Sequence, residues 1–433
     1  MLDAQGVDGV IQLAEMGKAA AQVGWLMARE ILDEAALADF ILRALPQPGD
    51  NDPWPRRNLV LGALRSLPDD AKRERILRQL KKKLPQAAFA DLLLLAPFRR
   101  STWLMVDKLD KASRQAYWEG VAPDWIHESD DESSEAVERL LAAERPRAAF
   151  ASIRHKTDVL PATLLHKLLT KMAEGGKDKE GTYQLEHYHV EQAFSRLDKS
   201  NEVTLEEKAR LEFAYIDALS HPGGRREGYG IPNLEKYTEA NPSLFTQAIV
   251  WMYRRKDGGE DPPEWKTPAE NVQHLAERGY KLLEAIDRIP GHDDLGELQA
   301  ERLLKWVTSV RETCAELGRG DIADVCLGKL FAGAPEGTDG IWPCEPVREV
   351  MEEIQTEALG SGAHTGLYNS RGVHWRGEGG GQERDLAEKY RKGARALQYS
   401  HPFVASVHTS MAKTYEHEAT HHDTEAGIRR RMR

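Results

Sequence analysis

Residues 66–110 read SLPDDAKRERILRQLKKKLP (66–85), QAAFADLLLLAP (86–97) and FRRSTWLMVDKLD (98–110). Each part is about one helix long, and its apolar residues recur three or four positions apart, which is the spacing of one helix face. Pro68, Pro85 and Pro97 separate the parts, and proline disfavours helix at the residue before it. The stretch therefore predicts three consecutive helices with short connections, which force neighbouring helices to run antiparallel.

The same pattern continues through the chain. Apolar residues recur at helical spacing in 34–45, 211–219 and 303–317, and Pro123, Pro146 and Pro161 fall between periodic segments. Alternating apolar and polar residues, which would indicate strands, form no convincing run. No strict repeat period is present either. We predict an all-α fold, an irregular helical-repeat array of the HEAT-like or TPR-like α-solenoid type with a glycine-rich C-terminal loop region.

The composition indicates the cellular location of the protein and the kinds of partner to expect. The 433-residue chain has a net charge of −11 and three cysteines, and none of them forms a Cys-x-x-Cys pair. No apolar run approaches the roughly 18–20 residues that a membrane span needs, and the N-terminus does not resemble a secretory signal. We expect a cytoplasmic protein with reduced thiols, no membrane contact and no cofactor. Nucleic acid stays possible as a partner, through the basic helix at 72–83, but the acidic balance does not favour it.

Two composition changes predict domain boundaries. The acidic, serine-rich stretch 127–135 and the glycine- and proline-rich stretch 220–232 both interrupt the helical pattern. We therefore expect an N-terminal helical array at 1–126, a middle array at 127–222 and a C-terminal helical region at 223–433 with a glycine-rich loop at 361–384.

Close to the C-terminus, 417–421 reads HEATH, a literal His-Glu-x-x-His. Two histidines at positions i and i+4 share a helix face and can bind one zinc ion, with the glutamate as base. The apolar stripe of this helix is Val404, Val407, Met411 and Tyr415, which places His417 well away from the stripe and His421 on its flank, both as solvent-face residues. We interpret the motif as the polar end of a helix and keep His417 and His421 as weak metal candidates.

Another motif, Glu-x-x-His, occurs at Glu186/His189 and at Glu418/His421. Two copies of this motif and two further glutamates build di-iron sites in four-helix bundles. Because the motif fixes only two residues, we interpret Glu186 and His189 as solvated or locally hydrogen-bonded side chains.

The stretch 367–384 is rich in glycine and leads into a clear helix. A glycine loop before a helix can bind phosphate through its backbone N–H groups, but Glu383 and Asp385 in the first turn would repel an anion. We interpret the stretch as an ordered loop over the array, and a contact with a partner or ligand is the alternative. The candidate binding residues are Asn369, Arg371, His374, Trp375, Arg376 and Glu378.

Three segments, 230–235 (GIPNLE), 340–347 (GIWPCEPV) and 368–380 (YNSRGVHWRGEGG), support a resemblance. They resemble the C-terminal α-helical region of large uncharacterised bacterial genomic-island proteins with suspected roles in phage defence. The resemblance covers most of the chain. It implies a stand-alone version or the C-terminal part of a longer protein, and it attaches no activity to these motifs.

We therefore expect a non-enzymatic protein-interaction scaffold or sensor subunit of a bacterial anti-phage defence system, partnered by another subunit or a phage protein. Whether the chain is an enzyme stays open, and the sequence favours a protein that is not one. One alternative is a metal-dependent hydrolase that uses His417, Glu418 and His421. The other is a nucleic-acid-binding helical-repeat protein.

Overall fold

The computed structural model describes residues 2–16, 19–46, 52–123, 130–179, 181–184, 186–220, 229–371, 377 and 379–432. Within these ranges every regular element is a helix, apart from one isolated β-bridge between His292 and Leu298. The predicted all-α helical array is confirmed. Among the described helices, none combines the length and the apolar character that crossing a bilayer requires.

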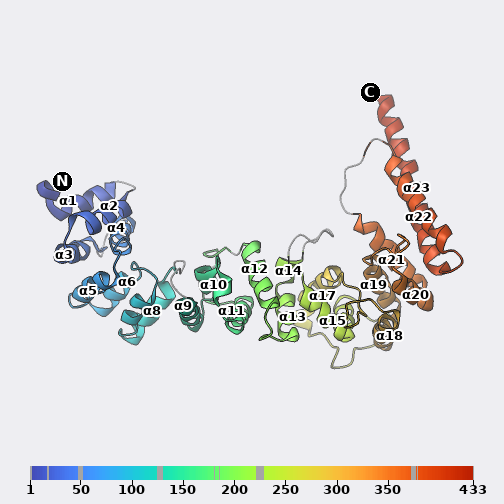
Figure 1. Ribbon diagram of the computed structural model, residues 1–433, viewed down its shortest axis with the longest axis horizontal. Helices are drawn as coiled ribbons and strands as arrows, with labels where there is room; N and C mark the ends of the chain where they lie inside the picture. The colour runs from blue at the N-terminus through green and yellow to red at the C-terminus, as the bar shows by residue number, and fades with distance from the viewer. Residues whose placement is uncertain are drawn as a thin grey trace. The chain divides into compact units, whose positions relative to one another are not determined.

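The chain forms two compact units, Met1–Glu202 and Val203–Arg433. The three-part division at 126/127 and 222/223 stays a prediction. In each unit the helices follow one another in chain order, and neighbours pack side by side (Figure 1). The elements of unit 1 are α1 (Leu2–Met16), α2 (Ala20–Leu26), the π-helix η1 (Met27–Ile31), α3 (Glu34–Ala44), α4 (Trp54–Arg65), α5 (Asp70–Lys81), α6 (Gln86–Leu93), α7 (Arg100–Val106), α8 (Lys111–Gly120), α9 (Asp130–Ala142), α10 (Pro146–Ile153), the 3₁₀ helix η2 (Thr157–Val159), α11 (Ala162–Glu174) and α12 (His187–Asp198).

Unit 2 contains the remaining helices. They are α13 (Leu205–Ala214), α14 (Ile216–Leu219), α15 (Pro232–Ala240), α16 (Pro242–Met252), the 3₁₀ helix η3 (Ala269–Asn271), α17 (Val272–Ala285), α18 (Ala300–Glu316), α19 (Gly320–Ala332), α20 (Glu345–Ile354), α21 (Glu357–Ser370), α22 (Gly381–Leu397) and α23 (Pro402–Met432).

The three helices predicted from residues 66–110 are present as α5, α6 and α7. In the basic helix α5, Ile76, Leu77 and Leu80 are buried, and the exposed Arg75 pairs with Glu34 at 2.6 Å. The buried stripe confirms the helical periodicity. Nucleic-acid binding by the exposed face stays a prediction.

The glycine-rich segment differs from the sequence-based prediction. Residues 361–384 were expected to form a loop, but 361–370 belong to α21 and 381–384 to α22. Gly362 of α21 allows close helix packing, because a Cβ there would lie 2.1 Å from the carbonyl oxygen of Val325 on α19. Glycine weakens an isolated helix, and here the absence of a side chain lets two helices approach within backbone contact.

Buried arginines join consecutive elements within both units. Among the described residues, Arg73, Arg145, Arg319 and Arg348 are buried, and each pairs with an aspartate while it donates to carbonyl oxygens at the end of an earlier helix or in a loop. A planar guanidinium can serve several acceptors at once. Arg73 pairs with Asp70 and donates to the carbonyl oxygens of Leu64 and Leu67, and Arg145 pairs with Asp178 and donates to those of Trp118 and Val121. Arg319 pairs with Asp261 and donates to the carbonyl oxygens of Tyr253 and Leu317, and Arg348 pairs with Asp339 and donates to that of Ile341.

Carboxylates from other elements cap several helices that begin with proline. Asp178 accepts the N–H of Arg147 in α10 at 2.8 Å, Glu212 accepts that of Leu234 in α15 at 2.7 Å, and Glu352 accepts that of Val404 in α23 at 2.9 Å. Proline suits the first helical position because no partner is needed there, and the remote carboxylate satisfies a following donor. Proline thus marks where each of these helices begins, and a carboxylate distant in the chain accepts one of its first N–H groups.

Candidate functional site

Helices α21, α22 and α23 bring together the two C-terminal regions that the sequence analysis identified. Asn369 and Arg371 lie at the end of α21, where Asn369 is exposed and Arg371 is partly buried. The other four candidate residues, His374, Trp375, Arg376 and Glu378, lie outside the described residues. The candidate binding residues therefore stay a prediction, and the structure describes the surroundings of Asn369 and Arg371.

Arg371 forms an ion pair with a buried carboxylate. Both of its terminal nitrogens lie 3.2 Å from Oε1 of Glu383, in the first turn of α22. The Glu383 side chain is only 1% exposed. Burial acts to raise the pKa of Glu383, but hydrogen bonding to its own backbone and to Arg371 outweighs burial and leaves this pKa below its ordinary value. Glu383 is therefore held as an anion inside unit 2.

Aromatic rings from all three helices meet beside this ion pair. The ring of Tyr415 on α23 stacks on that of Tyr390 on α22, with centroids 5.8 Å apart, and lies 6.1 Å from that of Tyr368 on α21. The guanidinium of Arg371 lies 5.6 Å from the centroid of Tyr415, a cation–π distance. Burial raises the pKa of Tyr390 to about 12, so this phenol is neutral.

HEATH lies on α23 directly beyond this cluster. The predicted stripe Val404, Val407, Met411 and Tyr415 is buried. His417 and His421 are exposed. Within the described part of the chain, His417 belongs to no group of three close potential metal ligands. The helical period predicted that both histidines lie on the solvent face, and the structure shows them there.

The glutamate of HEATH is half-buried and contacts α21. The hydroxyl of Tyr368 donates to Oε1 of Glu418, which links the end of α21 to α23. Glu383 and His422 lie close to the same carboxylate, and potential ligand atoms of the three residues are within 4.8 Å of one another. Sequence reasoning missed this group because it paired Glu418 with His421. The sequence does contain one signal for this group. Glu418 and His422 are four residues apart, which places them on one helix face.

The other Glu-x-x-His pair forms a local contact. Nδ1 of His189 lies 3.3 Å from a carboxylate oxygen of Glu186, and the His189 ring packs edge-on against that of His155 with centroids 4.9 Å apart. Burial lowers the pKa of His189, and this exceeds the opposing effect of Glu186. Glu186 and His189 thus contact each other locally, as one of the two interpretations expected, and His189 is buried rather than solvated.

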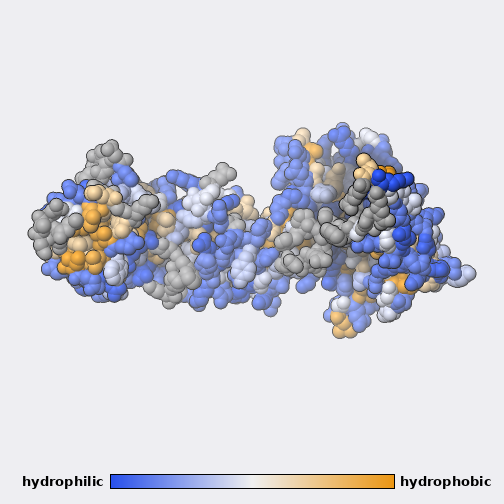
Figure 2. Space-filling model, turned by 90° about the horizontal axis from the view of Figure 1, so that it is seen from above, coloured by the Kyte–Doolittle hydropathy of each residue, from blue (hydrophilic) through white to orange (hydrophobic). Residues whose placement is uncertain are grey.

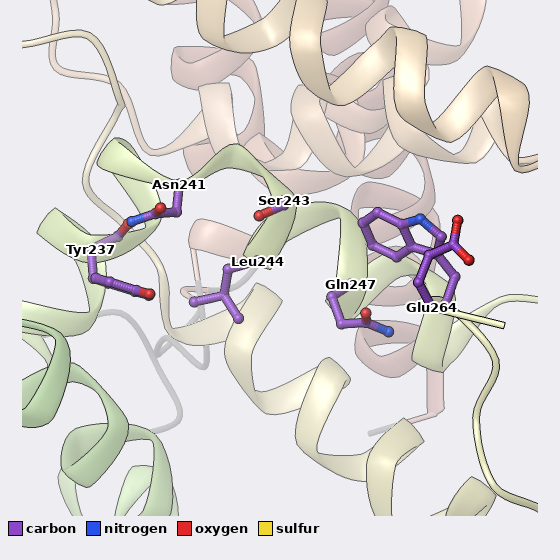
Figure 3. A pocket seen from close by; sticks show the side chains of 7 residues that line it. Tyr237, Asn241, Ser243, Leu244, Gln247 and Glu264 are labelled. Atoms are coloured by element: carbon purple, nitrogen blue, oxygen red, sulfur yellow. The ribbon is translucent and has the colours of Figure 1, made fainter. Parts of the chain in front are cut away.

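A surface hollow on α15 and α16 was not predicted from the sequence. It has a volume of about 360 Å³ and is lined by Tyr237, Asn241, Ser243, Leu244, Gln247, Glu264 and Trp265. Figure 3 shows Tyr237, Leu244 and Gln247 extending from these two helices. Its lining combines aromatic, apolar and amide groups, which suit an apolar side chain flanked by peptide groups.

A second surface lies on the first helices of unit 1. Large hydrophobic side chains are exposed there, and Figure 2 shows hydrophobic residues gathered over the N-terminal helices on the face that it draws. Met16 is 87% and Trp54 66% exposed. We name this the N-terminal apolar surface, and define it by Leu13, Met16, Trp25, Leu26, Ile31 and Trp54. Trp25 of this surface is 43% exposed.

The chain was compared with known proteins in three ways. No protein-family model, no curated protein and no solved structure matches it.

Proposed function

We propose that the chain is a protein-interaction scaffold or sensor subunit and that the N-terminal apolar surface is where it binds a partner protein. The observation that carries the proposal is the exposure of large apolar side chains from α1, α2, η1 and α4. Soluble proteins seldom leave such groups together in water, and where they do, the groups mark interaction sites. A partner that covers Trp54 and Met16 would remove much apolar area from water.

The architecture and a second surface support the same function. A helical array presents extended surfaces rather than one enclosed cavity. The hollow at Tyr237 and Trp265 in unit 2 offers an aromatic and amide lining of the kind found at interfaces. A bacterial anti-phage defence setting, with a phage protein or another subunit as partner and a cytoplasmic location, rests on the family resemblance of the sequence.

The test compares two matched double variants. The tagged chain is purified from its native host with and without phage infection, and each co-purified protein is then mixed in pure form with the chain to measure its affinity. The first variant, Met16→Ser with Trp54→Ser, changes the N-terminal apolar surface. The control, Leu295→Ser with Tyr399→Ser, changes two side chains in unit 2 that are 87% and 92% exposed.

We expect one stoichiometric partner whose affinity falls at least tenfold with the first variant and stays unchanged with the control. Equal affinity for both variants would show that the partner does not use this surface. If no purified protein binds the chain, the scaffold proposal is wrong.

A further inference from the structure

Three potential metal ligands converge between α22 and α23. Glu418 and His422 lie one turn apart on α23, and Glu383 approaches from the first turn of α22. One ligand atom from each residue lies within 4.8 Å of the other two. The approach is close because Gly380 packs against α23, where a Cβ would lie 2.3 Å from the carbonyl oxygen of Ala419.

A separate observation concerns the second oxygen of Glu418. Oε2 is buried and has no hydrogen-bond partner among the described residues, whereas Oε1 accepts from the hydroxyl of Tyr368. Buried polar atoms nearly always have a partner, and a water or ion beside the atom is one explanation of an exception. A cation next to Oε2 would supply the missing interaction.

Neighbouring groups orient two of the three ligands. Arg371 donates to Oε1 of Glu383 at 3.2 Å, and Tyr368 donates to Glu418. Metal-binding carboxylates in proteins are held in this way by hydrogen bonds from residues behind them. The arrangement thus fixes the carboxylates before an ion arrives, so little side-chain freedom is lost on binding.

We propose that Glu383, Glu418 and His422 bind one divalent first-row transition-metal ion, with Zn²⁺ as the best-suited candidate. An imidazole nitrogen together with carboxylate oxygens favours such ions over Mg²⁺ and Ca²⁺, which prefer oxygen ligands alone. In the tetrahedral geometry of zinc sites, two atoms that each bind one Zn²⁺ at about 2.0–2.2 Å lie about 3.3–3.6 Å apart. The three ligand atoms lie within 4.8 Å of one another, and side-chain rotation would have to bring them to this separation.

This site is distinct from the one that HEATH would form. A His-Glu-x-x-His zinc site uses both histidines as ligands and keeps the glutamate as a base. Here the glutamate is a ligand and the histidine is His422. His417 and His421 are exposed, and His421 belongs with His422 and Glu425 to a separate group of potential ligands on α23. The ion would join α22 to α23 and so stabilise the end of unit 2. This proposed role does not depend on partner binding at the N-terminal apolar surface.

The experiment uses the full chain after removal of metals with a chelator. Zn²⁺ is titrated against a chromophoric competitor, with Mg²⁺ as the comparison ion. We expect one Zn²⁺ per chain, no comparable binding of Mg²⁺, and a higher melting temperature with Zn²⁺. Glu383→Gln, Glu418→Gln and His422→Asn should each weaken Zn²⁺ binding at least tenfold. The controls His417→Ala and His421→Ala should leave the affinity unchanged.

Two further results decide the assignment. Co²⁺ in place of Zn²⁺ should give a visible absorption spectrum that changes with His422→Asn and not with His417→Ala. If His417→Ala and His421→Ala weaken binding as much as His422→Asn does, the ion sits on the HEATH face and the proposal is wrong. It is also wrong if no Zn²⁺ binds, or if Glu418→Gln, which changes a partly exposed residue and keeps its volume, binds as the wild type does.

Discussion

Gly328 of α19 and Gly362 of α21 lie in backbone contact, since a Cβ on Gly328 would stand 3.0 Å from the carbonyl carbon of Gly362 and 2.2 Å from the carbonyl oxygen of Leu359. Atoms at these separations overlap, so the two helices approach closely only because both positions lack a side chain. The same device joins α2 and α4, where a Cβ on Gly24 would lie 2.0 Å from the carbonyl oxygen of Leu59.

Gly362→Ala should destabilise unit 2. The added methyl group meets backbone rather than a movable side chain, so the helices must separate, and overpacking of this kind costs about 2–3 kcal/mol. Calorimetry would record a lower melting temperature. Gly360→Ala is the control, because its Cβ would lie 3.5 Å from the Phe403 ring on another face of α21. We expect the melting temperature of Gly360→Ala to equal or exceed that of the wild type, since alanine favours helix. Equal loss in both variants would contradict the packing argument.

Arg145→Ala should loosen the contact between α8 and α10. Arg145 donates to the carbonyl oxygens of Trp118 and Val121 at 2.9 and 2.6 Å and pairs with the buried Asp178. Its removal takes the cation from the buried Asp178, which keeps only its backbone hydrogen bonds, and breaking a buried ion pair in this way costs about 3–5 kcal/mol. Hydrogen exchange followed by mass spectrometry should show faster exchange in α8 and α10.

Arg145→Lys should not restore this protection, because an ammonium group cannot replace the planar fork that reaches all three acceptors. The exposed Arg147 provides the matched control, and Arg147→Ala should exchange as the wild type does. Wild-type protection in Arg145→Lys would show that charge alone suffices and that the fork geometry is not needed.

Glu212 should make stability depend on pH. Its side chain is fully buried, and burial raises its pKa from 4.5 to about 7 although Asn233, Leu234 and Tyr229 donate to it and lower this pKa. Because the folded pKa exceeds the unfolded one, folding favours the protonated form. The contribution of Glu212 to stability is therefore complete below about pH 4.5 and is lost as the pH rises through 7. The loss is on the order of 3 kcal/mol.

Glu212→Gln removes this titration. Melting temperatures of the wild type and the variant, measured from pH 5 to pH 8, should converge or cross in favour of the variant as the pH rises. A difference that is constant over this range would show that Glu212 does not change its charge there, and a difference that grows against the variant would reverse the assigned direction.

Local sequence signals determined where helices begin and which faces they bury. Pro146, Pro232 and Pro402 stand at the first positions of α10, α15 and α23 because proline restricts its own backbone and that of the residue before it. The stripes at 76, 77 and 80 and at 404, 407, 411 and 415 follow from the helical period alone. These properties depend on neighbours in the chain, so the sequence predicts them well.

Only the tertiary structure decided the roles of glycine and of charged residues. Gly362 looks like a loop residue in the sequence, because nothing nearby in the chain shows that another helix passes against it. Glu418 looked like the base of a HEATH motif, but its neighbours Tyr368 and Glu383 come from α21 and α22. Contacts between residues far apart in the chain depend on how whole helices pack. The spacing of residues within one helix does not predict which other helix packs against it.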